Sequence, residues 1–233
     1  MTDRDPTSPD GTESPLGLAG GKRPDLPPGP RAVYRAVLRA FATTGGPPEP
    51  AGLEAAARPF GLDSHDVLAE LEAGDYLGRD GQGRIRMAYP FSVRPTPHVV
   101  AIADGPTVYS MCALDALGIP PMLGTDAVIT TADPLTGTPV TVTFADGQAR
   151  WDRAEAVLYA GHTGCTGPAE EVVCGYLNIF TSAASAHRWA AEHPEITGEV
   201  LDQPGAEALA AELFGALLGD SSQAPGATEG ARS

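Results

Sequence analysis

Hydrophobic positions in the first part of the chain recur with helical spacing in three stretches, each followed by glycine. These stretches predict helices over residues 30–44, 53–60 and 64–73. Asp63 or Ser64 is expected to cap the third helix, because a short polar side chain accepts the free N–H groups of the first turn. Two apolar runs then flank the turn-forming residues 80–83, which predicts a hairpin. Three helices and a hairpin outline a winged-helix-like module, which we place at residues 31–94.

Beyond the Pro-rich segment at residues 94–97 the pattern changes to short strands mixed with helices. Hairpins are predicted around the turn residues 104–105 and 134–137. Further strands are expected over 156–159 and 176–180, and helices over 111–117, 168–173, 183–192 and 206–218. Gly118 and the pair Pro120–Pro121 are expected to end the helix at 111–117. Because the elements show no βαβ rhythm, the predicted class is α+β: a mixed core of antiparallel β-hairpins with surrounding helices.

The two ends of the chain are rich in Pro, Gly and polar residues. We therefore predict a disordered leader over residues 1–30, a disordered tail over 219–233 and a core domain over 95–218. The leader lacks an apolar stretch after a basic start, which argues against a secretory signal. No apolar run approaches the ~20 residues of a membrane span, so no membrane partner is expected.

The chain of 233 residues carries 15 Lys and Arg against 30 Asp and Glu, a formal net charge of −15. A nucleic-acid partner is therefore not expected, because binding to phosphates needs a basic surface. The predicted third helix of the winged-helix-like module carries only acidic charges, which disfavours DNA binding by that module as well. The odd number of cysteines, three, favours reduced thiols and a cytoplasmic location.

Cys112 is the first candidate for chemistry. It falls in the predicted first turn of a helix, where free N–H groups and the helix dipole favour the thiolate. Asp115 lies three residues later and shares one face of that helix. A carboxylate beside a thiol disfavours the thiolate, so the pair makes sense if the carboxylate moves a proton to or from a group that the sulfur has bound.

Cys174 begins a predicted apolar strand and could face Cys112 in the folded chain. Two facing thiols without a disulfide would form a soft-metal site. Cys165 lies in a glycine-rich loop and is read as accessory or incidental, although a structural zinc site of His162, Cys165 and Cys174 is an alternative. His98 is either a candidate site residue or a packing histidine. Each cysteine could also be a small buried apolar residue.

The segment Val108–Leu117, with Cys112-Ala-Leu-Asp115 at its centre, resembles the organomercurial (alkylmercury) lyases. The similarity covers roughly residues 85–218 and includes Tyr89–Ser92, Pro95–His98, Pro121–Gly124, Thr136–Val140, Asn178–Ser182 and Trp189–Ala190. The chain departs from the family pattern at Met111, where an aromatic residue is common, and at Gly175, where a second cysteine is frequent. A further cysteine that some members carry near Thr131–Asp133 is absent here.

The resemblance implies that Cys112, Asp115 and Cys174 are catalytic and that the cysteines and Asp115 hold the mercury of substrate or product. One thiolate would capture R–Hg⁺ and the other would complete a dithiolate. Asp115 would take a thiol proton and deliver it to the carbon, releasing R–H and Hg²⁺. No organic cofactor is implied; external thiols, or a mercuric reductase partner, would remove the ion.

Two other functions stay open on the sequence. A lyase-like relative could use the same three residues on another substrate. A non-catalytic regulatory protein could combine the winged-helix-like module with a thiol sensor for soft metals.

Overall fold

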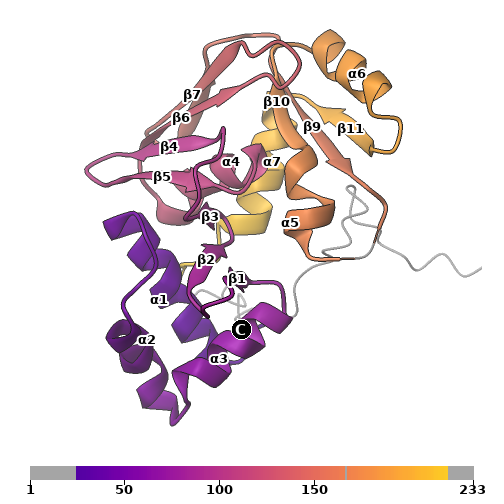
Figure 1. Ribbon diagram of the computed structural model, residues 1–233. Coiled ribbons are helices and arrows are strands. Elements are labelled where there is room, and N and C mark those ends of the chain that lie inside the picture. Colours follow the sequence, from indigo (N-terminus) through magenta and orange to yellow (C-terminus); the bar gives the residue numbers. More distant parts are fainter. Residues whose placement is uncertain (1–24, 166, 220–233) are drawn as a thin grey trace, which may run out of the picture.

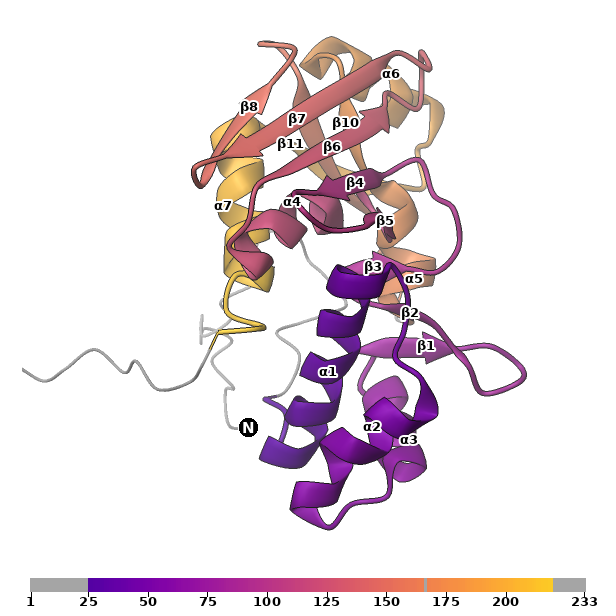
Figure 2. The same cartoon turned by 90° about the vertical axis from the view of Figure 1, so that its left-hand side faces the viewer.

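The structure is a computed structural model that describes residues 25–165 and 167–219; residues 1–24, most of the predicted leader, and 220–233 lie outside the described part. The chain begins with a helical module at one end of the molecule (Figures 1 and 2). Its elements are α1 (Pro28–Thr44), α2 (Pro50–Ala57), a 3₁₀ turn (Arg58–Phe60), α3 (Ser64–Ala73), β1 (Leu77–Arg79) and β2 (Ile85–Ala88). The predicted order of three helices and a hairpin is therefore observed, while the likeness to a winged helix stays a prediction.

Local sequence signals account for the ends of these helices. Asp63 caps α3, its carboxylate accepting hydrogen bonds from the backbone N–H groups of His65 and Asp66. Gly45 ends α1 in the left-handed conformation, which glycine adopts without steric cost. The leader predicted over residues 1–30 extends too far, because α1 already begins at Pro28, where proline's fixed φ suits a first helical turn.

The strands form two antiparallel sheets. The larger has eight strands in the order β1-β2-β3-β5-β4-β6-β7-β8. Besides β1 and β2, it contains β3 (Phe91–Ser92), β4 (Val99–Ile102), β5 (Thr107–Ser110), β6 (Ala127–Ala132), β7 (Pro139–Ala145) and β8 (Gln148–Trp151). The predicted hairpins at 80–83, 104–105 and 134–137 are confirmed, whereas β8 was not predicted. The predicted α+β class is confirmed.

The larger sheet continues across the predicted boundary at residues 94–97. Strand β3 pairs with β5, placing Phe91 opposite Ser110. Side chains of the helical module and of the later elements share one hydrophobic core, in which Phe41 of α1 stacks on Phe91 at a ring-centroid distance of 5.2 Å. The helical module is therefore packed directly against the elements that follow it. The division into domains at this boundary stays a prediction.

The smaller sheet has the order β10-β9-β11 and lies beside the last helices of the chain (Figure 1). Its strands are β9 (Val157–His162), β10 (Leu177–Phe180) and β11 (Thr197–Leu201). The neighbouring helices are α5 (Ala169–Val172), α6 (Ala183–Glu192) and α7 (Gln203–Phe214). Cys174 does not begin a strand as predicted: it begins a 3₁₀ turn, Cys174–Tyr176, and β10 starts at Leu177.

Helix α4 (Ala113–Leu123) is longer than predicted. Gly118 and Pro120–Pro121 lie inside it, and the helix ends at Gly124, whose N–H donates to the carbonyl of Pro120. The expected stop at Gly118 was wrong because this glycine serves helix packing: the ring of Phe214 in α7 fills the space that a Cβ at position 118 would need. Helix α4 is almost entirely buried and lies beside α7 (Figure 2).

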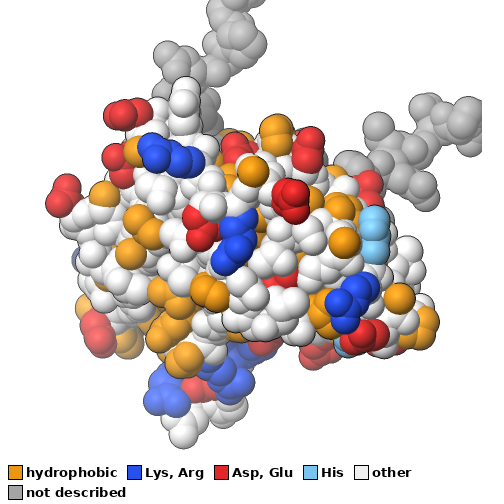
Figure 3. All heavy atoms as spheres, turned by 90° about the horizontal axis from the view of Figure 1, so that it is seen from above, with side chains coloured by type: hydrophobic (Ala, Val, Ile, Leu, Met, Phe, Trp, Pro, Cys, Tyr) orange, Lys and Arg blue, Asp and Glu red, His pale blue; other side chains and the backbone are white. Residues whose placement is uncertain are grey.

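The face of the molecule seen from above carries hydrophobic, basic and acidic side chains among uncharged polar and backbone atoms (Figure 3). Viewed from above, Asp and Glu side chains occur at several separate places (Figure 3), in keeping with the net charge of −15. Among the described residues, no helix combines the length and apolarity that crossing a membrane requires.

Candidate active site

The first thiol of the site sits where β5 passes into α4. Cys112 was predicted in the first turn of the helix, but it is the N-cap of α4, one position before that turn, and its Sγ accepts a hydrogen bond from the backbone N–H of Asp115 at 3.3 Å. The thiol therefore does what a serine or aspartate commonly does at a helix start. The preceding backbone is fixed by the N–H of Met111, which donates to the carbonyl of Pro90.

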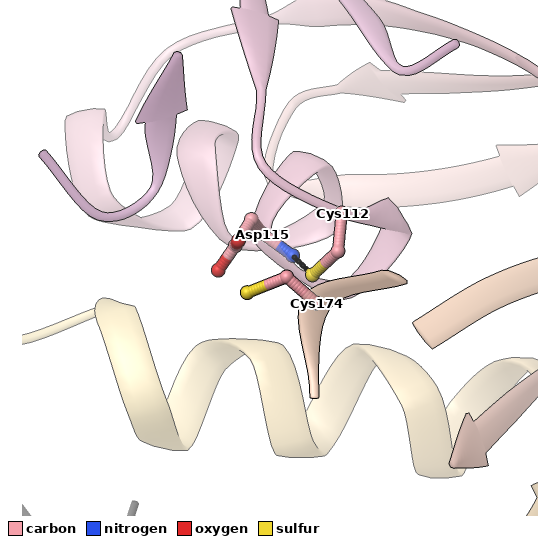
Figure 4. Close-up of side chains that lie close together, drawn as sticks. All are labelled: Cys112, Asp115 and Cys174. Carbon is pink, nitrogen blue, oxygen red and sulfur yellow. Dashed lines mark hydrogen bonds between the residues drawn. The ribbon is translucent and has the colours of Figure 1, made fainter. Parts of the chain in front are cut away.

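The second thiol approaches from a segment 62 residues later in the chain, since Cys174 follows α5. The Sγ atoms of Cys112 and Cys174 and a carboxylate oxygen of Asp115 all lie within 4.8 Å of one another. Figure 4 shows the three side chains converging, with α7 running past them. All three cysteines of the chain are free thiols. The predicted convergence of the two sulfurs beside one acid is therefore present in the structure.

The site is enclosed. The exposed fraction is 0% for Cys112, 4% for Asp115 and 7% for Cys174. Burial raises the pKa of the Cys112 thiol well above its usual value, and the hydrogen bond with Cys174 and the negative charge of Asp115 raise it further. The N–H of Asp115 acts in the opposite direction and is outweighed. The helix start thus favours the Cys112 thiolate as expected, but burial and the two neighbouring groups outweigh it, and the net effect is to raise the pKa of the thiol.

This set of donors suits a soft, thiophilic metal atom. Two sulfur ligands favour such metals, and a nearby carboxyl group can take or give a proton. Among the described residues, the other close group of possible metal ligands is Asp63, His65 and Asp66, which is exposed at the start of α3, where Asp63 caps the helix.

Ser110 is a buried residue that the sequence analysis did not single out. Its hydroxyl donates to the carbonyl of Cys112 at 2.9 Å, the same carbonyl that accepts the N–H of Ala116. Thr96 in turn donates its hydroxyl to the carbonyl of Ser110 at 2.8 Å. A serine two residues before a cysteine carries no signal of this kind in the sequence, because the contact depends on the turn from β5 into α4.

The remaining candidates lie outside the site. Within the described residues, the alternative zinc set of His162, Cys165 and Cys174 is not among the close groups of metal ligands, and Cys165 is exposed. His98 is a packing histidine: its Nδ1 is 2.8 Å from the hydroxyl of Thr131, and burial lowers its pKa to about 4.

A polar cluster around Asp133 lies at the turn between β6 and β7. Its carboxylate is fully buried and accepts hydrogen bonds from Thr181, from Ser185 and from two backbone N–H groups of its own turn. Asp133 therefore joins the β6–β7 hairpin to the start of α6. The sequence analysis missed this role, because the donors follow almost 50 residues later.

Comparison with known proteins places this chain in a family. The family model described as MerB, alkylmercury lyase, matches residues 91–215. The alkylmercury lyase of Pseudomonas putida is 30% identical over 63% of this chain and 69% of its own length. That of Streptomyces lividans is 31% identical over 72% of this chain and 77% of its own.

A solved structure supports the same fold. The crystal structure of the mercury-bound form of MerB2 superposes with a TM-score of 0.69 over 87% of this chain and 96% of that one, at 22% sequence identity. The family match and the curated relatives together define the class of the protein as a lyase. The chain belongs to the alkylmercury lyase family and is an enzyme of the carbon–mercury lyase type.

Proposed function

We propose that this protein cleaves the carbon–mercury bond of organomercurials, R–Hg⁺, by protonolysis to R–H and Hg²⁺. The observation that carries the proposal is the approach of two buried thiols and one carboxylate to within 4.8 Å of one another. Two metal–sulfur bonds of about 2.3 Å each, the length known for zinc, would span a similar distance between the sulfurs. Cys112 and Cys174 hold the mercury atom of the substrate, and Asp115 moves the proton.

The first step forms sulfur–mercury bonds. Because burial raises the pKa of Cys112, its thiol needs a base before it can bind mercury, and the neighbouring Asp115 carboxylate accepts that proton. Cys174 then adds as the second sulfur and its proton leaves the site. Each sulfur donates electron density through mercury to the carbon, which makes that carbon a better proton acceptor.

The second step breaks the carbon–mercury bond. The Asp115 carboxyl group gives its proton to the carbon, R–H departs with the bonding electron pair, and Hg²⁺ stays on the two thiolates. The balance is R–Hg⁺ plus two thiols giving R–H, the mercury dithiolate and one H⁺. Enclosure favours this step, since a site closed to water strengthens the interaction between the acid and the developing carbanion.

Product release needs acceptors for mercury. External thiols exchange with Cys112 and Cys174 and restore both protein thiols, and hand-off of Hg²⁺ to a mercuric reductase is a suitable next stage. The scheme uses no organic cofactor, since the metal arrives in the substrate. It requires both cysteines to be reduced, which fits the cytoplasm, where cellular reductants maintain thiols.

The test is turnover of phenylmercury by the purified protein with excess external thiol, with benzene measured by gas chromatography. Cys112→Ala and Cys174→Ala should each abolish benzene release. Asp115→Ala should still bind mercury through the two sulfurs and release little benzene. Cys165→Ser is the matched control, because this exposed cysteine lies outside the site and its loss should leave turnover unchanged. Stoichiometric Hg²⁺ binding by the wild-type protein without benzene release would contradict the proposal.

A further inference from the structure

Two polar contacts join α5, the short helix before Cys174, to the N-terminal helical module formed by α1 to β2. The first is a helix cap supplied from a distant part of the chain. Pro168, at the N-cap of α5, has no side-chain acceptor, and the carboxylate of Asp75 instead accepts the N–H of Ala169 at 3.0 Å. Asp75 lies 94 residues earlier, between α3 and β1. Its negative charge is favourable at a helix start, where the unpaired N–H groups point.

The second contact is an ion pair between Arg86 of β2 and Glu170 of α5. Both side chains are about 30% exposed, at 29% and 30%. Arg86 is itself held in place, because its Nε donates to the carbonyl of Arg79 at 3.3 Å. The pair therefore sets the position of α5 relative to the β1–β2 hairpin.

The position of α5 depends on these polar contacts, because a cavity takes the place of side-chain packing between α5 and the N-terminal module. About 330 Å³ of open space lies between the module and the α5 segment, with Leu77 and Met87 on one side and Gly167 and Pro168 on the other. Asp75, Arg86 and Glu170 also line this cavity. On this side, α5 is therefore held by hydrogen bonds and charge and not by close apolar packing.

Cys174 follows α5 after a single intervening residue. The opposite side of the segment packs into the core through Val172 and Val173, and the carbonyl of Val172 accepts the N–H of Thr163 at 3.0 Å. Because the helix has only four residues, a shift at its start is transmitted directly to the sulfur of Cys174. The distance between the two thiols of the site therefore depends on where α5 is fastened.

We propose that Asp75 and Arg86 of the N-terminal module are positioning residues that hold α5, and with it Cys174, against Cys112. The N-terminal module would thereby contribute to the geometry of the site, although neither thiol of the site belongs to it. The effect on turnover rests on the proposed function, whereas the effect on the placement of Cys174 does not.

The test measures how fast iodoacetamide alkylates each cysteine, with mass spectrometry of the three cysteine peptides. Cys165 is exposed and serves as the internal reference in every sample. Arg86→Gln and Glu170→Gln should speed alkylation of Cys174 about two- to fivefold, the range for loss of a partly exposed ion pair. Asp75→Ala should speed it about fivefold, as loss of a helix cap would. Phenylmercury turnover should fall through kcat, because the dithiolate closes less often.

Glu171→Gln is the matched control, since it removes the same charge from the neighbouring exposed position of α5. Cys174 in this variant should be alkylated as slowly as in the wild type. The charge-reversed pair Arg86→Glu with Glu170→Arg should restore slow alkylation relative to either single reversal, which a general loss of stability would not do.

The positioning role is overturned if Cys174 is alkylated as slowly in Asp75→Ala, Arg86→Gln and Glu170→Gln as in Glu171→Gln. This conclusion holds whatever the turnover of the variants. If the wild type releases no benzene while Cys174 still responds to the variants, the proposed function fails and the positioning role stands.

Discussion

Phe214 of α7 packs its ring against the bare Cα of Gly118 in α4, three residues beyond Asp115. The contact brings α7 close to the helix that carries the acid of the site (Figure 4). It also fixes which residue can stand at position 118, because a Cβ there would collide with three atoms of the Phe214 side chain.

Gly118→Ala should therefore destabilise the protein, although alanine is the better helix former. We expect a loss of about 1–3 kcal/mol in the free energy of unfolding, the range for an overpacked core. Urea denaturation measures it. Gly52→Ala in α2 is the control: its new Cβ would meet only Pro48 at 3.4 Å, an ordinary contact, so it should gain up to about 1 kcal/mol. Equal effects of the two substitutions would refute the packing argument.

Removal of the Asp115 charge should make Cys112 easier to ionise. The carboxylate is one of the groups that raise the pKa of this thiol, so Asp115→Asn should lower it. Burial remains, and the pKa should stay above that of an exposed cysteine. Thiolate absorbance followed against pH reports the change, with Cys165→Ser as the background to remove the exposed thiol. Benzene release should be lost in the same variant even though the thiolate forms more readily, and an unchanged thiolate titration would contradict the arrangement.

His98 should make stability depend on pH between its ordinary pKa of 6.5 and its value in the folded protein of about 4. Because the folded pKa is lowered, the neutral ring stabilises the fold above pH 6.5, and this contribution is lost as the pH falls toward 4. The shift corresponds to about 3 kcal/mol. Urea denaturation at several pH values should show this loss in the wild type and a shallower dependence in His98→Asn. His187→Gln, an exposed histidine, should behave as the wild type.

Asp133→Asn should destabilise the fold by about 2–4 kcal/mol, because an amide nitrogen would face donors that now share one carboxylate oxygen. Burial opposes the charged form of Asp133, but hydrogen bonds from Thr181 and Ser185 outweigh it and lower the pKa. The stabilisation is thus present above the unfolded pKa and is lost as the pH falls through the lower folded value. The difference in the free energy of unfolding between the wild type and Asp133→Asn, measured by urea denaturation, should therefore become smaller at those acidic pH values.

Asp152→Asn is the control for that substitution. Its side-chain oxygen accepts a single backbone N–H, from Thr141, at an exposed position, so a change within about 0.5 kcal/mol is expected. A comparable loss in the free energy of unfolding of both variants would show that the hydrogen bonds to the buried Asp133 carboxylate stabilise the fold no more than one exposed hydrogen bond does.

Turn chemistry predicted the hairpins well. The segments around Asp80, Asp104 and Pro134 each combine turn-forming residues with apolar runs on either side, and such signals act within a few residues. The helix containing Gly118 was misjudged for the opposite reason. Glycine and proline ordinarily end helices, but here contact with α7, from 96 residues farther along the chain, decides what the glycine does.

The sequence by itself determined the chemical groups of the site and the pairing of two of them. Asp115 follows Cys112 at a spacing of three positions, so a helix starting there brings them together, and the Cys-Ala-Leu-Asp pattern carries the family resemblance. The resemblance implied that Cys174 belongs to the site, but only the tertiary structure decided that its sulfur lies beside Cys112, that burial raises the pKa of the Cys112 thiol, and that Asp75 and Arg86 contact the segment before Cys174. Contacts over such separations, and the desolvation they cause, arise from packing of the whole chain, which local sequence patterns do not encode.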